Sequence, residues 1–418
     1  MKVALINPGL GGYSDTPPIN LALLASYLRS KKHVVLIIDR LIGYDVEKTL
    51  AHFMPDVVGI TGTTPVINDA YKMADYCKGL GIYTVMGGVH VSVLPEEAIS
   101  HCDAVVIGEG EIVFDELCRS REKGIFQGKP VMDLDSLPSP AWDLVDMNFY
   151  TTVLSRVEIN FMSFVPKDTI MGNLLTSRGC PWNCNFCHNS FRTIPARYNS
   201  AERVIEDIKY LIDNFHITGL FFVEDNFFSN PERMKKICKL MKENNINIPW
   251  GANSRVDCIT DELVKTAKEA NCKQITFGWE SGNQRMLDVL GKKTTVELNK
   301  KSIILCNKYG IKASGTFMIG NPTETEEEAR ETIEFIRNND ILGPIGVCIT
   351  TPYPGTKIWE WCEREKLLPD VINWNELDFH HTTVNMTSMT REQLYKIFDD
   401  IIVVVMDKMN NSIRMVNL

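Results

Sequence analysis

Short apolar runs alternate along the first third of the chain with longer segments in which apolar positions recur every three or four residues. The short runs predict buried strands, and the longer segments predict helices with one face against a core. Regular alternation of the two predicts a parallel sheet covered on both faces. We therefore expect residues 1–121 to form a Rossmann-like, doubly wound α/β domain. The expected strands are 3–6, 34–38, 57–61, 84–86 and 104–107, and the expected helices are 21–29, 46–53, 67–80, 96–100 and 112–118.

The same alternation resumes in residues 169–369, where Asn230-Pro231 and Thr323-Glu324-Thr325 are helix-start signals. Six strand–helix units predict a partial (β/α)6 barrel of the TIM type, whose ligand face lies at the carboxyl ends of the strands. The expected strands are 169–176, 219–223, 249–253, 274–278, 312–319 and 346–350, and the expected helices are 202–214, 231–243, 261–270, 295–309, 325–338 and 356–365.

Between these two domains, Pro130, Pro138 and Pro140 punctuate the irregular stretch 122–168. Proline-rich spacers connect domains semi-rigidly, so this stretch is expected to be a linker. The sequence does not predict how the two domains are oriented.

The last segment, 370–418, is expected to be mainly helical. Thr390-Arg391-Glu392-Gln393 is a capping-box start for a helix over 392–409. The apolar run 401–406 within it is expected to pack against the body of the protein or against a second copy. This segment also contains the adjacent histidines His380 and His381. They could line the entrance to a substrate site or lie on the surface, and the sequence favours neither.

Composition narrows the class of protein. The chain has 418 residues, of which 44% are hydrophobic and 23% charged, as is usual for a globular protein with sizeable cores. The net charge of −9 argues against a nucleic-acid partner, because such a partner requires a basic face. No apolar run is long enough to span a membrane, and the first run, stopped by Asn7 and Pro8, is too short for a signal peptide. We expect a cytoplasmic protein.

Three cysteines, Cys180, Cys184 and Cys187, have the spacing C-x3-C-x2-C just after the first expected barrel strand. Three thiolates hold three corners of a four-iron cube and leave one iron open for a cofactor or substrate. A zinc site would need a fourth ligand, and His188 follows Cys187 too closely to complete a tetrahedron easily. The other nine cysteines are scattered singly, as buried small hydrophobes are.

The cysteine motif resembles that of the radical S-adenosylmethionine (radical SAM) superfamily, and the resemblance covers residues 173–368. It implies a [4Fe-4S] cluster whose open iron binds S-adenosylmethionine (SAM). Phe186 fits the aromatic residue that the superfamily places near the adenine, and Glu280 and Ser281 lie in its Gly-x-Glu-Ser-Gly pattern. Among the polar loop residues, Arg255 or Ser281 is expected at the methionyl carboxylate, and Asn226 or Glu280 at the nucleoside. The expected SAM-binding set is Phe186, Asn226, Arg255, Glu280, Ser281 and Gly320.

Loops rich in glycine and hydroxyl groups follow four of the five strands expected in the first domain. Glycines let the backbone approach a ligand closely, and hydroxyls can bond to it. Gly-Gly-Val-His at 87–90 and Gly-Glu-Gly-Glu at 108–111 resemble the cobalamin-binding domain found in front of many radical enzymes. The expected cobalamin-binding set is Gly12, Tyr13, Thr61, Thr63, Thr64, Gly87, Gly88, His90, Gly108, Glu109 and Gly110.

One motif of that family, Asp-x-His-x-x-Gly, is absent. Residues 39–43 lie near where it would fall and contain no histidine, so cobalt is expected to have no histidine below it. His90 is expected to be a loop residue rather than a cobalt ligand. No G-x-G-x-x-G follows the first strand, which argues against a dinucleotide. A first domain that has lost its cofactor stays an alternative.

Together the two resemblances imply a cobalamin-dependent radical SAM enzyme. In that family an electron donor such as ferredoxin or flavodoxin drives cleavage of SAM to a 5′-deoxyadenosyl radical, and methylcobalamin supplies a methyl group. The leading hypothesis is C-methylation of an unactivated sp3 carbon in a small molecule or in a peptide or protein residue, of which a glutamine in methyl-coenzyme M reductase is one case. Alternatives are a cobalamin-containing cyclase or oxidase, a radical SAM enzyme whose first domain binds no cobalamin, and an electron carrier, which the missing fourth cysteine disfavours.

Overall fold

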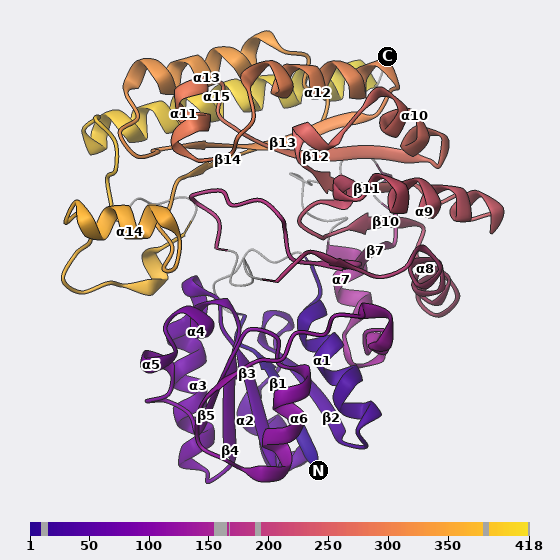
Figure 1. Cartoon of the computed structure of the whole chain (residues 1–418), viewed down its shortest axis with the longest axis vertical. Helices are drawn as coiled ribbons and strands as arrows, with labels where there is room; N and C mark the ends of the chain where they lie inside the picture. Colours follow the sequence, from indigo (N-terminus) through magenta and orange to yellow (C-terminus); the bar gives the residue numbers. More distant parts are fainter. Residues whose placement is uncertain (10–15, 154–164, 167, 189–193, 379–383, 417–418) are drawn as a thin grey trace.

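The computed structural model describes the chain except for residues 10–15, 154–164, 167, 189–193, 379–383 and 417–418. Two parallel sheets, one in each of two lobes, are stacked along the long axis of the molecule (Figure 1). The expected α/β class is therefore confirmed.

The first lobe is built on a six-stranded parallel sheet with the order β2-β1-β3-β4-β5-β6. Its order reverses between β1 and β3, the switch point beside which such sheets bind ligands. In β1, Val3 and Leu5 enter the core that contains α1 and α6, while Ala4 and Ile6 enter the core that contains α2 and α3. Both faces of the sheet are thus buried, as is usual for parallel sheets. The elements are β1 (Lys2–Asn7), α1 (Ile19–Ser30), β2 (Val34–Asp39), α2 (Val46–Phe53), β3 (Val57–Thr61), α3 (Ile67–Gly79), β4 (Tyr83–Gly87), β5 (Ala104–Ile107), α6 (Glu111–Ser120) and β6 (Gly124–Gln127).

The strand β6 was not predicted. It pairs with β5 at the edge of the sheet and carries the sheet past residue 121, the expected end of the domain. Its residues are only partly buried, so the sequence shows no continuous apolar run there. Two short helices, α4 (Val89–Val93) and α5 (Pro95–Ala98), follow β4 where a loop and one longer helix were expected.

The second lobe is a curled half-barrel of six parallel strands, as predicted. The strands lie side by side in chain order, β7-β10-β11-β12-β13-β14. Side chains that precede its helices accept a hydrogen bond from the backbone of the first turn, which explains why the helices begin where they do. These caps include Ser200, Asn230, Thr260, Thr295, Thr325 and Thr356. The elements are β7 (Met171–Leu174), α8 (Ala201–Phe215), β10 (Gly219–Phe222), α9 (Pro231–Glu243), β11 (Trp250–Ser254), α10 (Asp261–Glu269), β12 (Cys272–Glu280), α11 (Gln284–Val289), α12 (Val296–Lys308), β13 (Lys312–Ile319), α13 (Glu326–Asn338), β14 (Ile345–Ile349) and α14 (Lys357–Arg364).

Part of the described segment between the lobes is packed into the core. Trp142 and Tyr150, the latter in helix α7 (Met147–Val153), are buried in one hydrophobic core that also includes residues of both sheets. The last helix, α15 (Arg391–Val416), packs against α13 and β14 and buries Leu394 and Ile401. Packing of this helix against the body of the protein, one of the two surfaces expected for it, is therefore confirmed.

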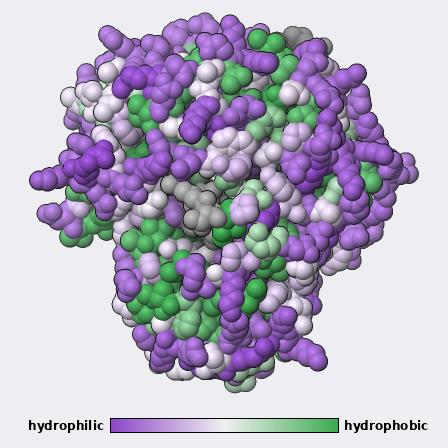
Figure 2. Space-filling model, in the orientation of Figure 1, coloured by the Kyte–Doolittle hydropathy of each residue, from purple (hydrophilic) through white to green (hydrophobic). Residues whose placement is uncertain are grey.

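The face seen in Figure 2 is mainly hydrophilic, with hydrophobic residues in separate areas. None of the helices in the described part of the chain is long and apolar enough to cross a membrane.

Candidate functional site

A cavity of about 820 Å³ lies between the two lobes. Its lining includes Thr61, Gly87 and Gly108, which end or follow strands of the first sheet, and Asp225 and Glu280 at the corresponding ends of the barrel strands. The carboxyl ends of both sheets therefore open into the same space. This is the position at which both kinds of fold bind ligands.

The three cysteines of the motif line this cavity on the barrel side. Cys184 is buried, and Arg255 donates from Nη1 to its sulfur at 3.6 Å. Burial raises the pKa of the Cys180 thiol, so a bound cation such as iron is needed to hold it as a thiolate. No three histidine, cysteine or carboxylate side chains of the described residues are grouped as ligands of a single metal ion, whereas a cube takes each thiolate at a different iron. The donor set fits an iron–sulfur cluster held at three corners.

The loop that carries the cysteines is closed at its base by a buried polar network. Glu224 accepts hydrogen bonds from the backbone N–H and the hydroxyl of Thr176, at 2.9 and 2.5 Å. Arg233 of α9 donates to the Thr176 carbonyl at 2.9 Å and to the Asn199 carbonyl at 2.7 Å. One arginine thus joins the residues just before and just after the loop. Two short antiparallel strands, β8 (Ser177–Arg178) and β9 (Arg197–Tyr198), form the neck above it.

Asn185, between the second and third cysteines, holds the loop to the barrel wall. Its Nδ2 donates to the Val289 carbonyl at 2.8 Å, and its backbone N–H donates to the Leu290 carbonyl at 2.8 Å. Its own carbonyl accepts from the N–H of Ile358 in α14. This role was not predicted, because an asparagine between two cysteines looks like any loop residue.

Arg255 follows β11 and is buried in the cavity wall. It forms a bidentate pair with Asp257, both contacts at 2.9 Å, and donates to the Lys292 carbonyl at 2.7 Å. Its guanidinium stacks over the Trp182 ring, 4.7 Å from the ring centroid. Most of its donors are therefore committed within the protein, and its position beside Cys184 places a fixed positive charge at the cysteine loop.

Glu280, at the end of β12, forms a buried ion pair with Lys292 on the cavity wall. Glu280 has a φ of +63°, and the pairing register of β12 shifts beside it. A Cβ on Gly278 would stand 2.3 Å from Glu280 Oε1 and 2.6 Å from Lys292 Nζ, so the pair depends on that glycine. Lys292 was not predicted, since Lys292-Lys293 in the sequence resembles an exposed basic pair.

Phe186 and Asp225 also face the cavity. Phe186 is half-buried and lies 5.8 Å, measured at its ring centroid, from Lys292 Nζ. Asp225 exposes its carboxylate to the cavity and has no partner among the described residues, while the surrounding protein raises the pKa of this group by desolvation. Asp225 precedes the predicted residue Asn226 in the loop after β10. Its position after a barrel strand is the sequence feature from which it could have been predicted.

Three predicted SAM-binding residues lie outside the cavity lining. The Ser281 hydroxyl is fully buried and bonds to Thr332 of α13 at 3.1 Å. Gly320 donates its N–H to Glu324 at 2.6 Å and has a φ of +80°. Asn226 is buried, with its Nδ2 donating to the Cys258 sulfur at 3.2 Å.

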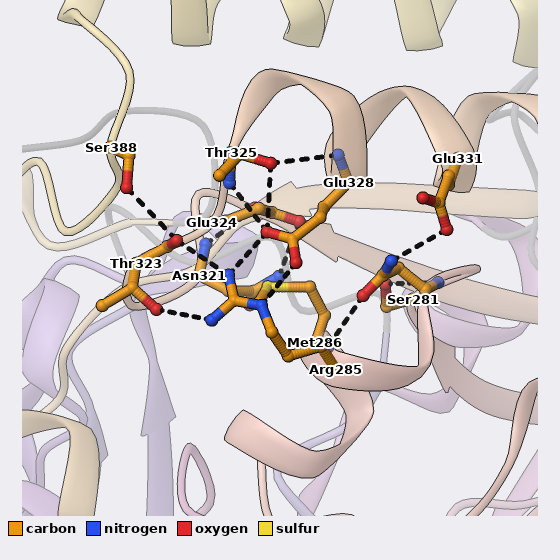
Figure 3. A network of polar contacts seen from close by, with 11 residues as sticks. Ser281, Arg285, Met286, Asn321, Thr323, Glu324, Thr325, Glu328, Glu331 and Ser388 are labelled. Carbon is orange, nitrogen blue, oxygen red and sulfur yellow. Dashed lines mark hydrogen bonds and ion pairs between the residues drawn. The ribbon is translucent and has the colours of Figure 1, made fainter.

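Figure 3 shows a network of polar contacts beside Ser281. Arg285 forms a bidentate pair with Glu328 and donates to the hydroxyl and carbonyl of Thr323. Thr325 and Glu328 form a capping box at the start of α13, and Ser388 of the tail donates to the Thr323 carbonyl. These contacts join the loops after β12 and β13 to the C-terminal segment, and none of the residues that make them is part of the cavity lining.

On the side of the first lobe, the lining contains six of the eleven residues predicted to bind cobalamin. They are Thr61, Gly87, Gly88, Gly108, Glu109 and Gly110. Gly88 has a φ of +102°, and a Cβ there would stand 2.7 Å from the Gly62 carbonyl oxygen, so only glycine suits this turn.

The cavity continues into the first lobe beside the sheet. This part is lined by Leu5, Gly59, Val85 and Phe114. A Cβ on Gly59 would stand 2.7 Å from the Phe114 ring, so any side chain there would clash with that ring. An apolar slot below a glycine-rich rim fits a cofactor that carries a flat aromatic base on a nucleotide tail, as cobalamin does.

His90, Thr63 and Thr64 are not part of the lining. His90 is buried and its Nδ1 shares a 3.1 Å hydrogen bond with the Thr64 hydroxyl, and its ring packs edge-on against Trp374 of the tail. Burial lowers its pKa to about 4, so it is neutral at physiological pH. The remaining predicted residues, Gly12 and Tyr13, lie outside the described residues, as do His380 and His381 of the tail.

The chain matches two family models, that of the B12 binding domain over residues 12–118 and that of the Radical SAM superfamily over residues 174–336. An uncharacterized methyltransferase of Pyrococcus horikoshii is 35% identical to it over 410 residues, covering 91% of this chain and 86% of that protein. The anaerobic magnesium-protoporphyrin IX monomethyl ester cyclase of Rubrivivax gelatinosus is 27% identical, covering 86% of this chain and 70% of that protein.

Among solved structures, the radical SAM methyltransferase TsrM of Kitasatospora setae, with cobalamin and a [4Fe-4S] cluster bound, superposes with a TM-score of 0.71. The superposition covers 97% of this chain and 91% of that chain. At 15% sequence identity, this likeness is one of fold.

Proposed function

Because this chain belongs to the cobalamin-dependent radical SAM methyltransferases, we propose that it transfers a methyl group to an unactivated sp3 carbon. The cofactors expected from the sequence, a [4Fe-4S] cluster, SAM and cobalamin, are those of its family. The observation that supports the proposal is the shared cavity, in which the cluster cysteines face the carboxyl ends of the B12-binding sheet. When bound, the cluster and SAM supply a radical that removes hydrogen, and cobalamin supplies the methyl group.

The chain's own residues have three tasks in this proposal. Cys180, Cys184 and Cys187 hold the cluster, and Arg255 places a positive charge beside it. The glycine-rich rim of the first lobe holds cobalamin. The largely apolar walls limit the access of water to a reactive radical, which would otherwise be quenched by side reactions.

The substrate is proposed to be a small molecule or a residue of a peptide or protein. A glutamine of methyl-coenzyme M reductase is one specific case within this class. The one-electron donor is proposed to be a ferredoxin or a flavodoxin.

A cobalamin-containing cyclase is the second candidate, and it is favoured by the relative from Rubrivivax gelatinosus. The higher identity to a protein named as a methyltransferase favours methyl transfer. Methyl-labelled SAM separates the two, because a methylated product carries the label and a cyclised product does not. Cobalt absorption of the anaerobically purified protein tests whether the first lobe is loaded.

Replacing Cys184 by alanine tests the radical assignment. We expect Cys184→Ala to abolish the formation of 5′-deoxyadenosine, because the cube loses one of its three protein ligands. Cys258→Ala is the matched control, since Cys258 lies near Cys180 but outside the cavity lining. Formation of 5′-deoxyadenosine at the normal rate by Cys184→Ala would contradict the assignment.

A further inference from the structure

Two arginines face each other at the neck of the cysteine loop. Arg178 and Arg197 are directly opposed in the antiparallel pair β8–β9, and both side chains are largely buried. Like charges in directly opposed positions destabilise a strand pair. A ladder this short is also marginal by itself. The neck therefore requires compensating negative charge from elsewhere.

That charge comes from the other lobe. Glu109 accepts from Arg197 Nη1 at 3.0 Å and pairs with Arg178 Nη1 at 3.2 Å. Glu111 pairs with Arg178 Nη2 at 2.5 Å. The linker completes the group, because Val131 donates its N–H to Glu109 and accepts from Arg197. We call Arg178, Arg197, Glu109 and Glu111 the neck latch.

The charges of the latch balance, two positive against two negative. Burial alone would raise the pKa of Glu109, but the hydrogen bond from Arg197 and the charge of Arg178 outweigh it and hold this pKa below its usual value. Glu109 is therefore an ionised, fully engaged carboxylate. It is poorly suited to act as a ligand of the corrin, although it lies in the predicted set.

The latch connects the two cofactor sites through a short path. Gly108 and Gly110, which flank Glu109, line the cavity at the rim of the first lobe. Arg178 lies two residues before Cys180. The rim loop is thus joined by buried ion pairs to a residue two positions before the first cysteine of the motif.

We propose that the neck latch is a positioning device through which the cobalamin-binding lobe fixes the cysteine loop, so that cleavage of SAM stays coupled to methyl transfer. The coupling half of this proposal rests on the proposed function. The mechanical half does not, because it concerns only contacts within the chain.

Hydrogen exchange of the unloaded chain tests the mechanical half. Glu109→Gln keeps the shape of the side chain but leaves the buried Arg197 guanidinium without its countercharge, while Arg178 keeps only Glu111. We expect exchange of the backbone amides of Ser177–Arg178 and Arg197–Tyr198 to become about tenfold faster. Asp103→Asn is the matched control, since Asp103 is a buried carboxylate paired with Lys123 at the opposite end of β5. Equal exchange at the neck in Glu109→Gln and in the unaltered protein would overturn the proposal.

The coupling half is measured in the reconstituted enzyme as 5′-deoxyadenosine formed per methylated product. We expect this ratio to rise severalfold in Glu109→Gln and in Arg197→Lys, which retains the charge and tests the geometry, and to stay unchanged in Asp103→Asn. An unchanged ratio in both latch variants would contradict the coupling. If the unaltered enzyme forms no methylated product, the proposed function fails, while the exchange experiment still decides whether the latch exists.

Discussion

Neighbouring residues at a strand end can belong to different sites. Glu280 faces the cavity and pairs with Lys292, while Ser281, the next residue, points to α13. The backbone turns sharply at Glu280, where φ is +63° and the register of β12 shifts, so the two side chains point in different directions. The polar side chain that shares the cavity with Glu280 is Lys292, twelve residues further along the chain.

Removing Lys292 tests the importance of this ion pair. We expect Lys292→Met to lower the free energy of unfolding by about 3 kcal/mol, because it leaves the buried Glu280 carboxylate unpaired. The double variant Glu280→Gln/Lys292→Met is expected to recover most of this loss, since neither charge then remains. Thermal unfolding of the three proteins measures both effects. A double variant no more stable than Lys292→Met would contradict a direct pairing.

At the residue scale, the sequence predicted the types of residue that line the cavity better than it predicted which individual side chains face it. The cysteines, Phe186, Arg255 and Glu280 all line the cavity. Asn226 and Gly320, at equivalent strand ends, do not line it, because loop polar groups also satisfy backbone and cap helices. Periodicity locates a strand end but does not say which way each polar side chain there points.

At the scale of elements, the turn between β13 and α13 contains a buried carboxylate. Glu324 is fully buried and accepts hydrogen bonds from the N–H groups of Gly320 and Asn321 at 2.6 and 2.9 Å. Burial outweighs these bonds and raises its pKa to about 7, above the 4.5 of an unperturbed glutamate. The protonated form is thus favoured in the folded state.

This shift predicts a pH-dependent stability. Because the folded-state pKa is the higher one, the contribution of Glu324 is fully present below pH 4.5 and is lost as the pH rises through about 7. Its full size is about 3 kcal/mol. Glu324→Gln cannot ionise, so its melting temperature relative to the unaltered protein should rise between these two pH values. Glu327→Gln, which neutralises an exposed carboxylate nearby, serves as the control. A constant difference across the range would contradict the prediction.

Most elements could be predicted because their boundaries have local causes. The buried strands are short apolar runs, and the helices of the barrel begin at residues such as Ser200 and Thr325 that cap them. The strand β6 escaped prediction because a half-exposed edge strand carries no apolar run. The pair β8–β9 escaped it because two residues are too few to show a period, and its stability depends on charges from another lobe.

At the scale of the whole molecule, the sequence predicted two domains and a semi-rigid linker but not their arrangement. The linker contributes Trp142 and Tyr150 to a core that includes both sheets, so the lobes share buried surface. Tyr150 also donates a hydrogen bond to Asp39 at the end of β2. Such contacts join residues more than one hundred positions apart, and no local pattern reports them.

A second connection between the lobes is made by the tail. Trp374 stacks beside Trp359 of α14, with ring centroids 6.0 Å apart, and packs edge-on against His90 of α4 at 4.8 Å. Its Nε1 donates to Glu97 of α5 at 3.1 Å. In Figure 1 the α14 region lies just above α4 and α5, on the opposite side of the molecule from α8. The tail therefore ties the end of the barrel to the rim of the cobalamin-binding lobe.

We expect Trp374→Ala to lower the free energy of unfolding by about 2 kcal/mol and to speed hydrogen exchange in Val89–Val93, because a half-buried ring and its hydrogen bond are lost. Trp374→Phe, which keeps an aromatic ring but cannot donate to Glu97, should show a smaller change in both measurements.

If the tail and the neck latch hold the same arrangement of the lobes, the effects of Trp374→Ala and Glu109→Gln on exchange at the neck will not add. Simple additivity would mean that the two ties act independently and that each lobe keeps its position without the other tie. We expect non-additivity, because both ties contact the rim of one sheet and the ends of one barrel.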